Sequence, residues 1–153
     1  MTHPVVEVAR RYVGAREVPK GSNRGPLIDD FTGGRAEPYC AHAVAFWHRV
    51  AGKPIPGDVI PTPLRANPLA SVSFTLRVFS EHDWLVREPA VGDVVFFRER
   101  GQSDPGRGRH IGIVVDVGDP KRLTIIDANW GDAVCERKID RQSESILAFG
   151  RRP

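Results

Sequence analysis

The spacing of the apolar residues changes at about Val91, and this change limits the folds that the chain can adopt. Before this point the apolar residues recur at helical spacing, between segments rich in glycine and proline. After it come short β-rich runs separated by Gly, Asp and Pro, at residues 93–98, 111–117, 123–127, 134–139 and 146–149. Helices followed by a meander of strands predict an α+β fold with an antiparallel sheet, because parallel sheets need alternating helices and strands.

Four segments of the first part have helical signals. Thr2 is positioned to cap a helix that has Pro4 in its first turn and stops at Gly14. A shorter pattern opens at Pro26 and ends at Gly33. The clearest helix spans residues 38–50, and another is expected over residues 71–82. Five prolines between residues 52 and 69 predict an extended loop there.

Length and composition indicate a globular protein. The 153 residues, 41% hydrophobic and 27% charged, predict one compact domain over residues 1–153 and no second domain. The formal charge is +3, but 19 acidic residues are interspersed among the 22 basic ones, so we expect a mixed surface and no nucleic-acid partner. No apolar run approaches the roughly 20 residues of a spanning helix, so no stable membrane insertion is expected.

Cys40 is the strongest candidate for a nucleophile. It lies in the first turn of the helix over residues 38–50, directly after Pro38 and Tyr39. A helix N-terminus stabilises a thiolate through unpaired N–H groups and the helix dipole. The alternative is a small buried hydrophobic residue, the usual role of an intracellular cysteine.

His110 is the candidate base. It opens a strand-like run after a glycine-rich loop, and Gly112 leaves space beside it. Asp127 ends the next run, so antiparallel pairing can bring its carboxylate beside the imidazole. Asn129 could orient the imidazole instead, could bind substrate, or could be an ordinary turn residue.

The other histidines and the second cysteine are weaker candidates. His42 and His48 share the helix of Cys40, two and eight residues on, where neither projects back over the thiol. Cys135 lies in an amphipathic run typical of packing. No CxxC or HxxxH spacing occurs, so we expect no metal site and no cofactor.

Five segments in this order resemble the CHAP family, the cysteine/histidine-dependent amidohydrolases and peptidases of bacteria and phages. The likeness covers residues 12–149. The segments are 14–26, the cysteine helix that begins at Pro38, 92–96, the histidine strand from His110, and 127–129.

The resemblance implies a papain-like α+β domain, with N-terminal helices on an antiparallel sheet of five or six strands. It implies hydrolysis of an amide bond in bacterial peptidoglycan, as a muramoyl-alanine amidase or a stem or cross-link endopeptidase, with Cys40, His110 and Asp127 or Asn129 as catalytic residues. Tyr39 and Trp130 are expected to line the substrate cleft. Family members often carry a glutamine before the cysteine, whereas this chain has Glu37, Pro38 and Tyr39 in that stretch.

Two other functions remain open: a papain-like deamidase or peptidase that acts on a protein, and a non-catalytic module that binds an anionic polymer. The N-terminus has no secretory signal pattern, so we expect synthesis in the cytoplasm and action on the wall after holin-type release, virion delivery or secretion-system injection. No long exposed apolar stripe is evident, and we expect a monomer.

Overall fold

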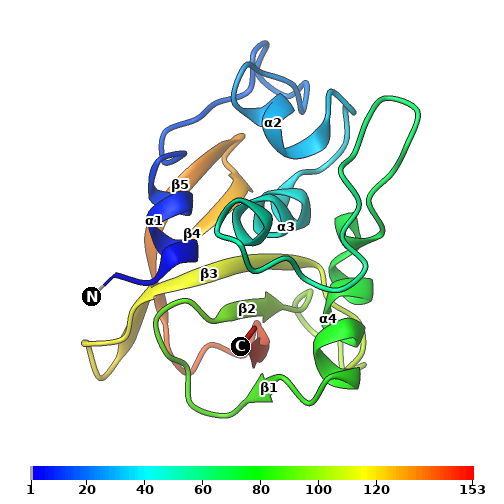
Figure 1. Ribbon diagram of the computed structural model, residues 1–153. Helices are drawn as coiled ribbons and strands as arrows, with labels where there is room; N and C mark the ends of the chain where they lie inside the picture. Colours follow the sequence, from blue (N-terminus) through cyan, green and yellow to red (C-terminus); the bar gives the residue numbers. More distant parts are fainter. Residues whose placement is uncertain (1) are drawn as a thin grey trace.

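The computed structural model describes residues 2–153 and has an α+β architecture (Figure 1). Its helices come first and its strands follow, as the change of pattern near Val91 predicts. The helices are α1 (Pro4–Arg10), α2 (Ile28–Thr32), α3 (Cys40–Val50), the 3-10 turn η1 (Pro68–Ala70) and α4 (Val72–Glu81). The strands are β1 (Leu85–Val86), β2 (Val94–Phe97), β3 (His110–Asp116), β4 (Arg122–Trp130), β5 (Ala133–Asp140) and β6 (Ile146–Gly150).

The strands form one antiparallel sheet in the order β1-β6-β2-β3-β4-β5. The run β2-β3-β4-β5 is a meander of sequential neighbours, and this confirms the predicted antiparallel sheet. The C-terminal strand β6 returns to pair with both β1 and β2. The two-residue strand β1 is absent from the sequence-based prediction, because it is too short to produce an alternating pattern.

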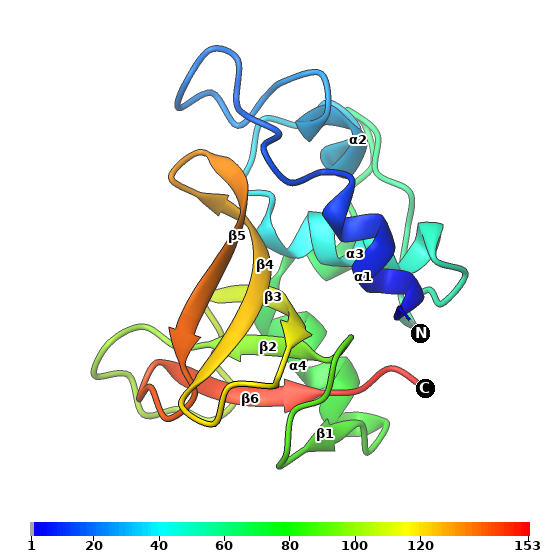
Figure 2. The ribbon, with the colours of Figure 1, turned by 90° about the vertical axis from the view of Figure 1, so that its left-hand side faces the viewer.

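Helices α1 and α3 pack together on one face of the sheet (Figure 2). Strand alternation divides the apolar residues between two clusters. Val94 and Phe96 of β2 join the main core under the helices, whereas Val95 and Phe97 join a smaller cluster on the other face. Among the described residues, no helix is long and apolar enough to cross a membrane.

Local signals explain where the helices begin and end, with two corrections, both in α1. The N-cap of α1 is His3, whose ring accepts a hydrogen bond from the Val5 N–H, and not Thr2 as predicted. That helix also ends at Arg10, four residues before the predicted stop. Ser71 caps α4 as an N-cap residue should, with its hydroxyl accepting from the Phe74 N–H at 3.1 Å.

Candidate functional site

The structure brings the three principal candidates together where the N-terminus of α3 meets strands β3 and β4. Cys40 is the first residue of α3 and is 8% exposed. His110 is the first residue of β3, and Asp127 lies near the end of the neighbouring strand β4, fully buried. The prediction that pairing of these strands places the acid beside the imidazole agrees with this geometry.

His110 and Asp127 are joined by a short hydrogen bond, in which Nε2 of His110 donates to Oδ2 of Asp127 at 2.7 Å. The register explains the contact, since Gly112 is the direct partner of Asp127 across the strand pair. A Cβ atom at position 112 would lie 3.1 Å from the Asp127 Cβ and 3.1 Å from the Ile126 carbonyl oxygen. Glycine at this position therefore leaves the acid room to reach a histidine two residues away along β3.

The site holds His110 in its charged form. Burial alone would lower the pKa of His110, but hydrogen bonds to Asp127 and to the Cys40 thiol outweigh it and raise the pKa to about 9. Because Nε2 is engaged by Asp127, Nδ1 is the ring nitrogen left for Cys40. A partly buried imidazolium thus lies between a carboxylate and a thiol, the order of groups found in thiol hydrolases.

Arg137 of β5 is a part of the site that sequence reasoning missed. Its Nε donates to both oxygens of Asp127, at 3.2 and 3.1 Å, and its Nη2 donates to Oδ2 at 2.7 Å. The guanidinium also lies over the Trp130 ring, 3.8 Å from its centroid. Only the register of β4 and β5, which pairs Asp127 with Cys135, places Arg137 diagonally opposite this acid.

Asn129 follows Asp127 by two residues but lies in an irregular part of the strand. The register between β4 and β5 shifts between Asp127 and Trp130, and Asn129 has a left-handed backbone with φ of 65°. Its side chain lies at the cavity described below, and the acid that contacts His110 is Asp127. Of the two residues considered for orienting the imidazole, the geometry therefore favours Asp127.

The expectation that Tyr39 lines a substrate cleft does not match the structure. The Tyr39 side chain is fully buried, and its hydroxyl donates to Oε2 of Glu17 at 3.2 Å. Burial and the neighbouring Glu17 carboxylate raise the pKa of this phenol. The residue before the cysteine points into the core because it packs against Phe31, with ring centroids 6.3 Å apart.

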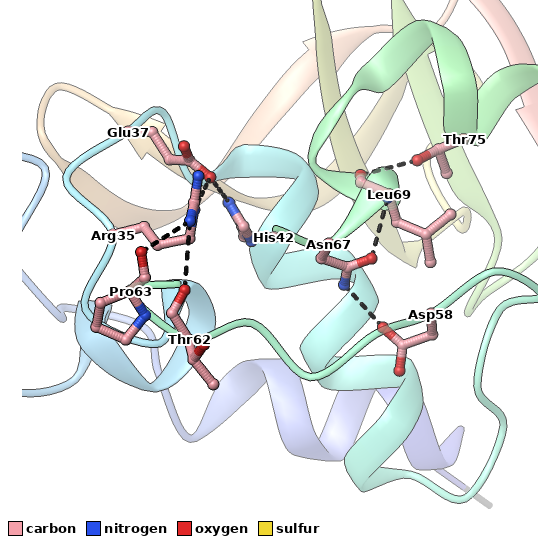
Figure 3. Close-up of polar contacts among 9 residues, drawn as sticks. All are labelled: Arg35, Glu37, His42, Asp58, Thr62, Pro63, Asn67, Leu69 and Thr75. Atoms are coloured by element: carbon pink, nitrogen blue, oxygen red, sulfur yellow. Dashed lines mark hydrogen bonds and ion pairs between the residues drawn. The ribbon is translucent and has the colours of Figure 1, made fainter. Parts of the chain in front are cut away.

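The segment before Cys40 is held by a charged network (Figure 3). Burial would raise the pKa of Glu37, but hydrogen bonds from His42 and Arg35 outweigh it and lower the pKa. The His42 Nε2–Glu37 Oε1 distance is 2.6 Å, and burial lowers the pKa of His42. Arg35 also donates to the carbonyls of Thr62 and Pro63, so the network joins the cysteine segment to the proline-rich loop.

Asn67 organises the other end of that loop (Figure 3). Its side-chain oxygen accepts from the Val59 and Leu69 N–H groups, and its amide donates to Asp58 at 2.8 Å. Asn67 is 3% exposed, so these bonds satisfy a buried polar side chain. The loop over residues 52–69 is therefore irregular, as predicted, but anchored.

A cavity of about 820 Å³ opens beside Cys40 and His110. Trp130, half exposed at 52%, forms part of its wall. The remaining lining residues come from β2, the β2–β3 connection, β5 and the turn before β6: Phe97, Arg98, Arg100, Arg109, Arg137, Lys138, Ile139, Asp140, Ser143 and Ser145, with Pro38 and Asn129. None of these basic residues was predicted as a site residue from the sequence, because the segments that carry them become neighbours only in the folded sheet.

The remaining candidates lie apart from this chemistry. His48 is fully buried with its Nδ1 donating to the Val44 carbonyl, and burial lowers its pKa to about 4. Cys135 is half buried, and its thiol contacts the Trp130 carbonyl at 3.5 Å. Within residues 2–153, no cluster of three or more His, Cys, Asp or Glu side chains is arranged to hold a metal ion.

Comparison with known proteins bears on the fold. No protein-family model matches the chain, and no curated protein matches it. A solved structure from Staphylococcus aureus subsp. aureus Mu50, described as similar to lipoprotein of the NLP/P60 family, aligns with a TM-score of 0.51 at 15% identity. The alignment covers 97% of this chain and 40% of the staphylococcal chain. The protein therefore shares the papain-like α+β fold of an NLP/P60 family member.

Proposed function

We propose that this protein is a cysteine hydrolase that cleaves an amide bond in bacterial peptidoglycan. The observation that carries the proposal is the hydrogen bond of His110 to the buried Asp127, beside Cys40, which lines the same cavity as His110. The NLP/P60 family is a papain-like family of cell-wall peptidases related to the CHAP family, which supports a cell-wall substrate.

The reaction proceeds by acyl transfer in two steps. The Cys40 thiolate attacks the scissile carbonyl, and His110 donates its proton to the leaving amine as the C–N bond breaks. Water, deprotonated by His110, then attacks the thioester and releases the acid and the thiol. Asp127 holds the imidazole and stabilises its charged form throughout.

The helix supplies one oxyanion donor. Cys40 is the first residue of α3, so its N–H has no partner within the helix and is free for the oxyanion. Loss of one such donor in other hydrolases costs roughly 3 kcal/mol of transition-state stabilisation. Glu37, which stands where family members often carry glutamine, is committed to His42 and Arg35 and does not supply a second donor.

Digestion of purified peptidoglycan sacculi tests the proposal. The wild type and Cys135→Ala should release fragments with new amine termini, identified by mass spectrometry, and Cys40→Ala should release none. The fragments also distinguish an amidase from an endopeptidase. Activity retained by Cys40→Ala would refute the assignment of the nucleophile, and intact walls from several bacterial classes would favour a protein substrate. Delivery by holin, virion or secretion system stays a prediction.

A further inference from the structure

The cavity beside Cys40 has a strongly unbalanced set of charges. Its lining includes the basic side chains Arg98, Arg100, Arg109, Arg137 and Lys138, and within the described part of the chain Asp140 is the one carboxylate among the lining residues. The protein as a whole is close to balanced, with 22 Lys and Arg against 19 Asp and Glu. The positive charge is therefore a property of this cavity and not of the whole surface.

Two of the basic residues are already engaged. Arg137 is bonded to Asp127, which neutralises it. Arg98 is half buried and its Nη2 donates to the Ile146 carbonyl at 3.2 Å, so it holds β2 against β6. The charge of Arg137 is therefore balanced by Asp127, whereas Arg98 keeps its charge but is held in place by the bond to Ile146.

The other three are available. The Arg109–Glu99 contact is long, at 3.7 Å, and both side chains are more than 60% exposed, so it contributes little and can be exchanged for a ligand. In residues 2–153, Arg100 and Lys138 form no ion pair with Asp or Glu within 4.0 Å. Both are exposed.

These three residues line the same cavity as Cys40 and His110. Arg109 directly precedes His110, and Arg100 belongs to the same β2–β3 connection. Lys138 follows Arg137 on β5. Cationic side chains that line a cleft attract anions and focus the field within it.

We propose that Arg100, Arg109 and Lys138 form a subsite for a carboxylate that lies next to the scissile amide of an acidic peptide. This inference rests on the proposed function and adds its substrate class: a peptide with a free carboxylate beside the bond that is cut. Arg100 and Arg109 can each present the planar donor pair that matches a carboxylate, and Lys138 adds a mobile point charge.

Alkylation of Cys40 tests the subsite without knowledge of the natural substrate. Iodoacetate and iodoacetamide are of similar size and both add to the thiolate with loss of iodide, but only iodoacetate is an anion. The ratio of their rate constants at Cys40, with the modified residue identified by mass spectrometry, measures the positive potential at the thiol. The charged His110 contributes to this ratio in every variant, so the comparison among variants isolates the subsite.

We expect the iodoacetate/iodoacetamide ratio to fall roughly two- to threefold in Arg109→Gln and in Arg100→Gln, the effect of one unit charge acting through solvent across a cleft. The triple variant that also carries Lys138→Gln should lose about tenfold, and 0.5 M salt should abolish these differences. Arg87→Gln is the matched control, since Arg87 is exposed and does not line the cavity.

A ratio unchanged in the triple variant would overturn the subsite even if Cys40 reacts rapidly. A Cys40 that reacts with iodoacetamide no faster than a free thiol would instead overturn the proposed catalytic site, while the ratio would still report on the subsite. In a second assay, sacculi whose carboxylates have been converted to amides should be cleaved several-fold more slowly than native sacculi. Equal cleavage of the two substrates would also refute the subsite.

Discussion

Replacing Asp127 by asparagine should make the stability of the protein respond to pH in a way that identifies its bond with His110. The pKa of about 9 lies about 2.5 above the ordinary value of 6.5 for histidine. At 1.36 kcal/mol for each pH unit, the charged form of His110 then stabilises the folded state by about 3 kcal/mol. Asparagine has nearly the same shape as aspartate but no charge with which to hold the imidazolium.

The sign follows from the direction of the pKa change. Because folding raises the pKa of His110, this stabilisation is complete below pH 6.5 and is lost as the pH rises through 9. The difference in unfolding free energy between the wild type and Asp127→Asn should therefore be greatest near pH 6 and should shrink by up to about 3 kcal/mol towards pH 10, since Cys40, which also raises the pKa of His110, is present in both proteins. The bond between Asp127 and Arg137 adds a part that does not change over this range, since arginine stays charged.

Urea unfolding of both proteins from pH 6 to pH 10 measures this difference. Asp58→Asn is the control, because Asp58 is paired with Arg49 through bonds of 2.6 and 2.9 Å and its loss should cost the same at every pH. A difference for Asp127→Asn that stays constant across the range would refute the conclusion that Asp127 holds a charged His110.

Three further substitutions test separate parts of the structure. Gly112→Ala should lower kcat at least tenfold in the sacculus assay, because the added Cβ crowds the Asp127 Cβ at 3.1 Å and displaces the acid from His110. Arg137→Gln should raise the pKa of His110, measured by NMR titration. The Asp127 carboxylate then interacts with the His110 charge without competition from the Arg137 guanidinium. Asn67→Leu should lower the free energy of unfolding by roughly 3 kcal/mol in urea, because the buried Leu69 N–H and the partly buried Val59 N–H lose their acceptor.

Gly112→Ala has a matched control, and each of the three predictions has an outcome that would contradict it. Gly106→Ala places a Cβ 3.4 Å from the side chain of the exposed Asp104, which is an ordinary van der Waals contact, and should retain activity. An unchanged kcat in Gly112→Ala would show that Asp127 reaches His110 without the room that Gly112 leaves. A pKa of His110 that falls in Arg137→Gln would mean that Arg137 chiefly holds Asp127 in place. Unchanged stability of Asn67→Leu would show that the loop is not anchored through this residue.

Local sequence determined most of the helices and strands and the place of the candidate nucleophile. The position of Cys40 at a helix start follows from Pro38 and the alanine-rich run behind it, since capping and propensity act within a few residues. The start of β3 at His110, after a glycine-rich loop, is local in the same way. The order of helices before strands was sufficient to predict the α+β class and the antiparallel sheet, which the structure confirms.

Tertiary structure alone decided how these parts meet. Strand register decides that Asp127, and not Asn129, contacts His110 and that Arg137 binds this acid. Core packing decides that the Tyr39 side chain is buried. Register is set by which residues of distant strands are buried together, and a shift by one residue would send every side chain to the opposite face. The basic cavity has the same origin, because Arg109 and Lys138 are far apart along the chain and share a site only once β3, β4 and β5 have paired.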